Sequence, residues 1–290
     1  MKLAPAVVLV ASLASHADAN PASAWTAAKA SLSGAPAFVG GVKVSDVARL
    51  GVVKMLLSMG APDVNKGLEQ LQRVCGLDAW KTIEAVAWGL DADLHGVAFV
   101  AVKGLDQAKV ATCAEGLARD GGDKDAKATS TVDGAITTLV VGGETTYLRW
   151  IGKDVIAVAT DPADRALLEK WTKKGGLART KVGKLAAKAD TKAMVWAAST
   201  LEREVDGGKV QHAYGSIALR GAVLDGSVRV GFDSAANAKA AADKLHAALA
   251  ADDDGKALLA KLSVAADGAE VVVKGKLTES EVMQAAGSLR

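Results

Sequence analysis

Residues 128–141 read ATSTVDGAITTLVV and carry the clearest structural signal in the chain. Two β-prone runs, Ala128–Val132 and Ala135–Val141, flank the dipeptide Asp133-Gly134. An Asp-Gly pair in this position favours a tight turn, because the turn that matches strand twist needs positive φ angles. The stretch therefore predicts an antiparallel β-hairpin.

The same alternation of strands and helices extends on both sides of this hairpin. Upstream, the strands Glu84–Asp91 and His95–Lys103 precede a helix, Asp106–Arg119. Downstream, the strands Thr145–Ile151 and Asp154–Thr160 precede a helix that runs to Trp171. We expect this helix to open at Asp161-Pro162, because aspartate suits the N-cap and proline the first helical position.

The second half of the chain repeats this order of hairpins and helices. A hairpin around Asp225-Gly226 precedes an alanine-rich helix capped by Ser234, and a hairpin around Asp267-Gly268 precedes a last helix. That last helix begins with Thr278 and Glu281, which form a capping box. The expected elements are the strands Tyr214–Leu224, Ser227–Phe232, Leu262–Ala266 and Ala269–Lys274, and the helix Ala235–Ala250.

These patterns predict an α+β fold made of a duplicated unit. Each unit has mostly antiparallel β-hairpins, with helices packed on one face of the sheet. The aliphatic helix Ser45–Met59 is the expected cover of one sheet. The predicted divisions are a signal peptide (1–19), a linker (20–36), a first unit (37–174), a connecting segment (175–192) and a second unit (193–290).

The first residues, MKLAPAVVLVASLASHADAN, have the form of a secretory signal peptide. Lys2 precedes an apolar run, Leu3–Leu13, and Ala17-Asp18-Ala19 is a cleavage site, with Ala22-Ser23-Ala24 as a second one. We expect cleavage after Ala19 and a periplasmic or extracellular protein; the alternative is a buried N-terminal helix. No cysteine follows the site to carry a lipid anchor. No later stretch is apolar for long enough to predict a transmembrane segment in the mature chain.

Cys75 and Cys113 are the only cysteines. Each lies on the apolar stripe of a predicted helix, 63–75 for the first and 106–119 for the second, where two helices can meet. Export to an oxidising compartment favours a structural disulfide between them. Buried free thiols and a redox-active pair are the alternatives, although the C-x-x-C spacing of redox sites is missing.

One region also shows a family resemblance. It contains FVGGV at 38–42, LQRVCGLD at 71–78, Ile83 and Val86, Lys103-Gly104, and the second cysteine. Over about residues 37–120 the chain resembles exported proteins of unknown function from myxobacteria and related deltaproteobacteria, in which these features recur. The resemblance implies export and a disulfide, and it supplies no catalytic residue.

The sequence contains no recognisable motif for catalysis, metal binding or cofactor binding. The net charge of +2 lacks the basic footprint of a nucleic-acid binder. His95, His212 and His246 are far apart and have no zinc spacing, and His95 reads as part of a solvated turn with Asp91 and Asp93. Nucleophile-elbow and phosphate-loop motifs are missing. The acidic clusters 120–125 and 252–254 lack the glycine and glutamate of a calcium loop.

The sequence therefore favours an exported, non-catalytic envelope or secreted protein that binds a partner protein, a lipid or a small ligand. A duplicated unit could provide a cleft or an apolar pocket for it. One alternative is a hydrolase whose site is built from scattered Asp, Glu and His residues. Another is a structural or assembly protein of the cell envelope.

Overall fold

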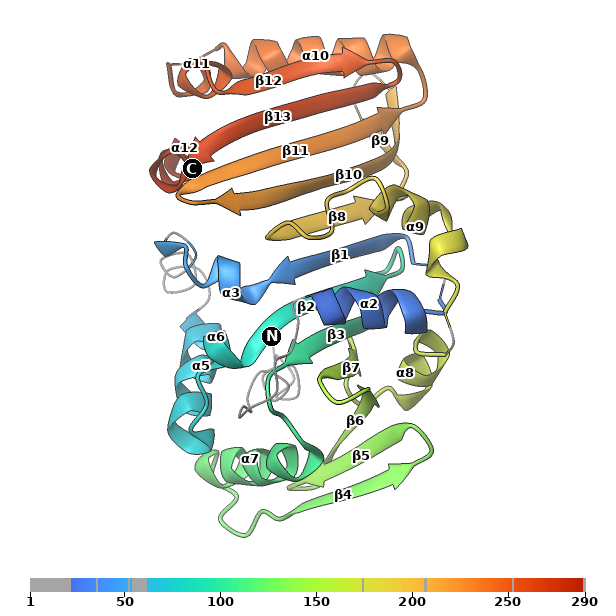
Figure 1. Ribbon diagram of the computed structural model, residues 1–290, viewed down its shortest axis with the longest axis vertical. Coiled ribbons are helices and arrows are strands. Elements are labelled where there is room, and N and C mark those ends of the chain that lie inside the picture. Colours follow the sequence, from blue (N-terminus) through green and yellow to red (C-terminus); the bar gives the residue numbers. More distant parts are fainter. Residues whose placement is uncertain are drawn as a thin grey trace. The chain divides into compact units, whose positions relative to one another are not determined.

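The computed structural model divides into two compact units (Figure 1). Unit 1 comprises the chain up to Pro36 together with Gly41–Arg49 and Val53–Leu177, and unit 2 comprises Ala37–Gly40, Leu50–Val52 and Ala178–Arg290. The residues that the structure describes are 22–34, 36–51, 53, 62–173, 175–205, 208–251 and 253–288. Among the helices of these residues, none has the length and apolarity needed to cross a membrane.

Unit 1 contains an antiparallel sheet in the order β2-β3-β7-β6-β5-β4. Its strands are β2 (Ile83–Leu90), β3 (Gly96–Val102), β4 (Ala128–Asp133), β5 (Ile136–Val141), β6 (Glu144–Ile151) and β7 (Val155–Ala159). Its helices are α2 (Ala22–Ser31), α3 (Val44–Val47), α5 (Pro62–Cys75), α6 (Ala79–Thr82), α7 (Gln107–Asp120) and α8 (Arg165–Trp171). Strand β1 (Phe38–Lys43) contributes residues to both units.

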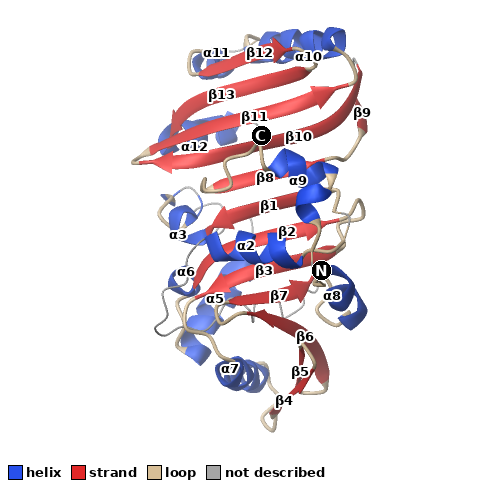
Figure 2. Ribbon diagram, turned by 45° about the vertical axis from the view of Figure 1, so that its right-hand side comes forward, coloured by secondary structure: helices blue, strands red, loops and turns tan. Residues whose placement is uncertain are grey.

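Helices cover both faces of the unit 1 sheet. The row Val86, Val100 and Ile156 packs against α5 and α7 in one core cluster. Side chains alternate between faces along a strand, and on the other face Leu32, which follows α2, reaches Gly89. Figure 2 shows α2 lying across β2 and β3. The prediction of helices on one face is therefore not confirmed for this unit.

Residues 22–31, which lie in the predicted linker, form helix α2 instead. Ala24, Ala28 and Leu32 are fully or almost fully buried. A run of Ala, Ser and Pro is typical of linkers, but alanine side chains also let a helix backbone approach a sheet closely. Within the segment 20–36, the structure thus contains a helix that packs against β2 and β3.

The predicted disulfide between Cys75 and Cys113 is confirmed. It joins the last residue of α5 to the middle of α7, with a Cα–Cα distance of 5.2 Å. Asp120 at the end of α7 accepts two hydrogen bonds from the Arg73 guanidinium, at 2.6 and 2.7 Å. The same two helices are therefore held by a covalent and an ionic link.

Unit 2 contains the antiparallel order β8-β10-β11-β13-β12, with β9 paired to β10. Helix α10 packs on this sheet through Ala238 and Ala242, which contact Phe232 and Val271. The strands are β8 (Val195–Ser199), β9 (Arg203–Val205), β10 (Gly208–Arg220), β11 (Val223–Phe232), β12 (Leu262–Asp267) and β13 (Glu270–Thr278). The helices are η1 (Leu177–Arg179, which begins in unit 1), α9 (Lys181–Ala186), α10 (Ala235–Leu249), α11 (Asp253–Leu259) and α12 (Glu279–Ser288).

Two predicted boundaries in the chain are wrong. The turn between β10 and β11 falls at Gly221-Ala222, where Gly221 has a φ of 65°, and Asp225-Gly226 lies inside β11. Helix α8 begins after Asp164, whose side chain caps it, rather than at Asp161-Pro162. Of the predicted helix 45–59, residues 52 and 54–59 lie outside the described part of the chain.

The predicted helix caps at Ser234 and Thr278 are confirmed. The Ser234 hydroxyl accepts from the Asn237 N–H at 3.1 Å. Glu281 accepts from the Thr278 N–H at 2.7 Å, and the Glu281 N–H donates to the Thr278 hydroxyl at 3.4 Å, which completes the capping box.

Removal of the disulfide should destabilise unit 1. The bridge closes a loop with a sequence separation of 38, and the chain-entropy argument assigns such a loop about 4 kcal/mol. We expect the Cys75→Ala/Cys113→Ala double variant to lose about that much free energy of unfolding in a denaturant titration. Reduced wild-type protein is the matched control, and equal stability of the oxidised and reduced forms would contradict the prediction.

Glu281 should titrate well below an ordinary glutamate. The Lys261 ammonium and the Thr278 backbone N–H lower the pKa of Glu281 to about 2. Because the folded pKa lies below the unfolded value, this interaction stabilises the fold above about pH 4.3 and is lost as the pH falls toward 2. A carboxyl NMR titration measures the pKa directly, and Lys261→Ala should raise it; an unchanged pKa in that variant would count against the ion pair.

Candidate functional site

An apolar groove crosses one face of the unit 2 sheet. It has a volume of about 210 Å³, and its lining surface is almost wholly apolar. All of its lining residues belong to unit 2. They are Phe38, Val195, Trp196, Ala197, Ala198, Ser199, Ala213, Tyr214, Gly215, Ser216, Ile217 and Val228.

The register of the strands explains why the groove has a low floor and higher walls. Ala197 of β8 lies opposite Gly215 of β10, which in turn lies opposite Val228 of β11. A side chain at Gly215 would come within 2.6 Å of the Ser227 carbonyl oxygen, so the position demands glycine. Small residues therefore form the floor, and larger apolar residues border it.

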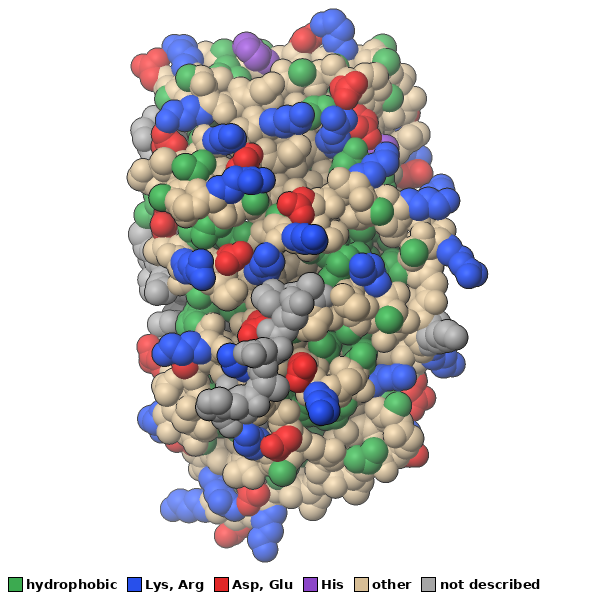
Figure 3. Space-filling view, viewed as in Figure 1, with side chains coloured by type: hydrophobic (Ala, Val, Ile, Leu, Met, Phe, Trp, Pro, Cys, Tyr) green, Lys and Arg blue, Asp and Glu red, His purple; other side chains and the backbone are tan. Residues whose placement is uncertain are grey.

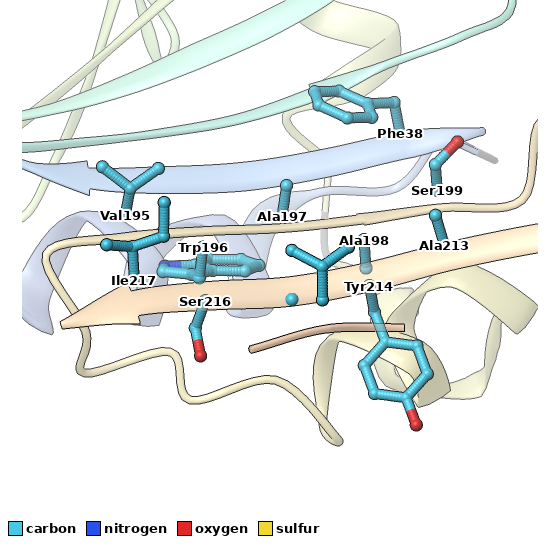
Figure 4. A pocket seen from close by; sticks show the side chains of 12 residues that line it. Phe38, Val195, Trp196, Ala197, Ala198, Ser199, Ala213, Tyr214, Ser216 and Ile217 are labelled. Atoms are coloured by element: carbon cyan, nitrogen blue, oxygen red, sulfur yellow. The ribbon is translucent and has the colours of Figure 1, made fainter. Parts of the chain in front are cut away.

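Figure 4 shows which side chains enter the groove and which leave it. Phe38, Val195 and Ile217 lie on its apolar side, whereas Tyr214 and Ser216 point away. Ile217 and Val228 are 38% and 41% exposed. Two large aliphatic side chains on neighbouring strands are thus left in contact with water.

Helix α10 covers only part of the same sheet face. Val230 and Val271 lie opposite each other under α10, and Val230 also lies opposite Ala213, which lines the groove. The face is therefore continuous, covered over β11, β13 and β12 and open over β8 and β10. Within the described residues no helix packs on the groove. Because a sheet normally buries its apolar face, this opening is the strongest candidate for a binding surface.

A cluster of charged and polar side chains lies on the opposite face of β10, β11 and β13. Glu270 accepts from Arg229 at 2.9 Å and lies 3.2 Å from Nε2 of His212. The Tyr214 hydroxyl is 3.5 Å from the same carboxylate, and Asp267 accepts from Arg229 at 3.0 Å. In Figure 3, Lys, Arg, Asp and Glu side chains are spread over the face in view.

Electrostatics keep Glu270 ionised within this cluster. Its partial burial raises the pKa, but hydrogen bonds from Arg229 and His212 lower it by more, so the pKa of Glu270 lies below its usual range. Burial and the neighbouring Glu270 charge raise the pKa of Tyr214. The cluster is a set of mutually satisfied charges on this part of the sheet.

Asp91, Asp93 and His95 lie together in the turn between β2 and β3, where the sequence predicts a solvated polar turn. One potential ligand atom from each lies within 4.8 Å of the others. One oxygen of Asp91 already accepts the N–H groups of Asp93 and His95, at 3.0 and 2.9 Å. These are the residues of the described chain that could hold a metal ion, and Asp93 and His95 are exposed.

The remaining predicted site residues are the cleavage site and two histidines. The cleavage site after Ala19 lies outside the described residues. His246 is exposed on α10, as its place on the polar side of the helix predicts. The sequence assigns no role to His212 and does not reveal the groove. Alternation along β8 and β10 signals an apolar face, but the groove itself depends on the register between strands.

Comparison with known proteins shows the fold alone. No protein-family model matches the chain, and no curated protein sequence does. The chain is similar to crystal form III of TP0453, with a TM-score of 0.50 and 11% identity over 90% of this chain and 97% of that one. Crystal form I of TP0453 gives a TM-score of 0.49 and 12% identity, over 94% and 98% of the two chains. The α+β class with a large antiparallel sheet is thereby shown.

Loss of the Glu270 charge should weaken unit 2. Glu270→Gln removes the ion pair with Arg229 while it keeps the size of the side chain, and we expect a loss of about 1 kcal/mol in unfolding free energy at neutral pH. The lowered pKa means that this stabilisation is lost as the pH falls, so wild type and variant should converge in acid. Parallel stability curves at all pH values would contradict the assignment.

Proposed function

We propose that the protein is an exported, non-catalytic binding protein that holds an apolar ligand, such as the acyl chain of a lipid, in the groove of unit 2. The observation that carries this proposal is the open apolar groove over β8 and β10. Its lining exposes almost no polar atom. Recognition there would rest on removing apolar surface from water rather than on hydrogen bonds.

The exposed side chains support the same conclusion. Burying apolar surface is worth about 25 cal/mol per Å², so covering Ile217 and Val228 would contribute favourable binding energy. The floor of Ala197, Ala213 and Gly215 lets a thin apolar chain approach the sheet closely. Export rests on the signal-peptide pattern at residues 1–19.

A hydrolase is the second hypothesis, because His212 beside Glu270 resembles an acid–base pair. This cluster and the groove lie on opposite faces of the sheet. The two hypotheses therefore use different residues and can be tested separately.

Filling the groove should block binding. Ala197→Phe places an aromatic ring on the groove floor, and we expect it to weaken binding of a fluorescent fatty-acid analogue by about tenfold or more. Ala265→Phe is the matched control, because Ala265 is exposed and pairs with Val272 on the opposite face. Equal affinity of the two variants would contradict the groove as the site.

Native mass spectrometry of the protein purified from its own periplasm tests the proposal without a chosen probe. We expect a chain cleaved after Ala19 that carries a lipid. A bare protein, with no affinity for the fatty-acid analogue, would overturn the proposed function.

A further inference from the structure

Strand β4 forms an open edge of the unit 1 sheet. Within the described chain it pairs with β5 alone. In an antiparallel pair, alternate residues turn their N–H and C=O groups away from the partner. Asp133 and Ile136 close the two-residue turn, so the outward residues of β4 are Ala128, Ser130 and Val132.

This edge lacks several of the features that normally protect a sheet, although α7 packs beside it and Gln107 donates to the Ser130 hydroxyl at 2.7 Å. Its register with β5 is continuous, with no bulge. Between Ala128 and Val141 there is no proline, and Asp133 is the only charged residue. Val132 on the edge itself is 61% exposed. Such edges are templates for pairing with another strand.

The other edge strand on the sheet path of the described chain, β12, also carries one charged residue, Asp267, because Glu270, Lys274 and Lys276 lie on its inner partner β13. The two edges differ in their exposed apolar surface. Among the large hydrophobic residues of β4 and β12, Val132 of β4 alone is exposed. This exposed side chain singles out β4.

We propose that β4 pairs antiparallel with β4 of a second copy of this chain, so that the two unit 1 sheets join across a two-fold axis at Ser130. This inference is independent of the groove. Outward residues must face outward residues for the backbone hydrogen bonds to form. A register centred on Ser130 meets that condition, because it places Ala128 opposite Val132 of the second copy.

The side chains fit this register. Thr129 lies opposite Thr131 of the second copy, and β-branched residues make favourable cross-strand pairs. Lys127 lies opposite Asp133 of the second copy, and symmetry creates this pair twice. Both groups are accessible: Lys127 is exposed, and the Asp133 side chain is 72% exposed although it accepts from Arg165 at 2.5 Å.

The first test is charge reversal, read as the monomer–dimer dissociation constant by sedimentation. Lys127→Glu turns two attractive pairs into two repulsive ones, and we expect dimerisation to weaken by about tenfold or more. The double variant Lys127→Glu/Asp133→Lys should recover affinity. Lys124→Glu is the matched control, because it makes the same charge change in the preceding exposed turn. A wild-type protein that stays monomeric, or equal effects of Lys127→Glu and Lys124→Glu, would overturn the proposal.

The second test reads the register directly. Opposed hydrogen-bonded residues have Cα atoms about 5.5 Å apart, which suits a disulfide. Ser130→Cys should therefore form a covalent dimer on mild oxidation, whereas Thr129→Cys, which faces Thr131 of the second copy, should not. Equal crosslinking of both variants, or none by Ser130→Cys, would overturn the register. The groove variant Ala197→Phe should dimerise like wild type, so failure of one proposal is distinguishable from failure of the other.

Discussion

The antiparallel pairing of β10 with β11 determines which side chains share a face throughout unit 2. Because opposed residues project to the same side, this register places Gly215 beside Val228 and Tyr214 beside Arg229. The pairing of β11 with β13 carries the same division outward to Glu270. The groove therefore lies on one face and the charge cluster on the other, and both follow from this single register.

The two units bury the apolar surface of their sheets to different extents. In unit 1, α5 and α7 cover one face of the sheet and α2 and α8 cover the other, and the disulfide holds the first pair together. In unit 2, α10 covers the apolar face over β11, β13 and β12. Over β8 and β10 the described helices leave that face open. The open apolar surface of β8 and β10 is what distinguishes unit 2 from unit 1.

Local signals predicted the parts of the fold that local chemistry decides. The hairpins near Asp133 and Asp267 form because Gly134 and Gly268 adopt a positive φ, although their two-residue turns lie one residue later than predicted, at 134–135 and 268–269. The caps at Ser234 and Thr278 form because their hydroxyls accept nearby N–H groups. The sequence pattern places the β10–β11 turn at Asp225-Gly226, which instead lies inside β11. The turn in the structure, Gly221-Ala222, lacks the Asp or Asn that usually marks such a turn. A hairpin built around Asp225-Gly226 gives Gly215 different cross-strand neighbours from those in the structure. The groove therefore could not be predicted from the sequence.

Both the edges and the apolar faces of a sheet are normally covered or otherwise protected, so the places where they are left exposed are informative. The chain can cover an edge strand, because α10 packs against β12. It can also cover a face, because alanines along α10 allow close packing on valines. An exposed sheet edge or an exposed apolar face is a departure from the usual pattern of protection. Such departures concentrate at functional sites. The β4–β5 hairpin, whose only charged residue is Asp133, and the bare floor around Ala197 are two such departures, on different elements and open to different partners.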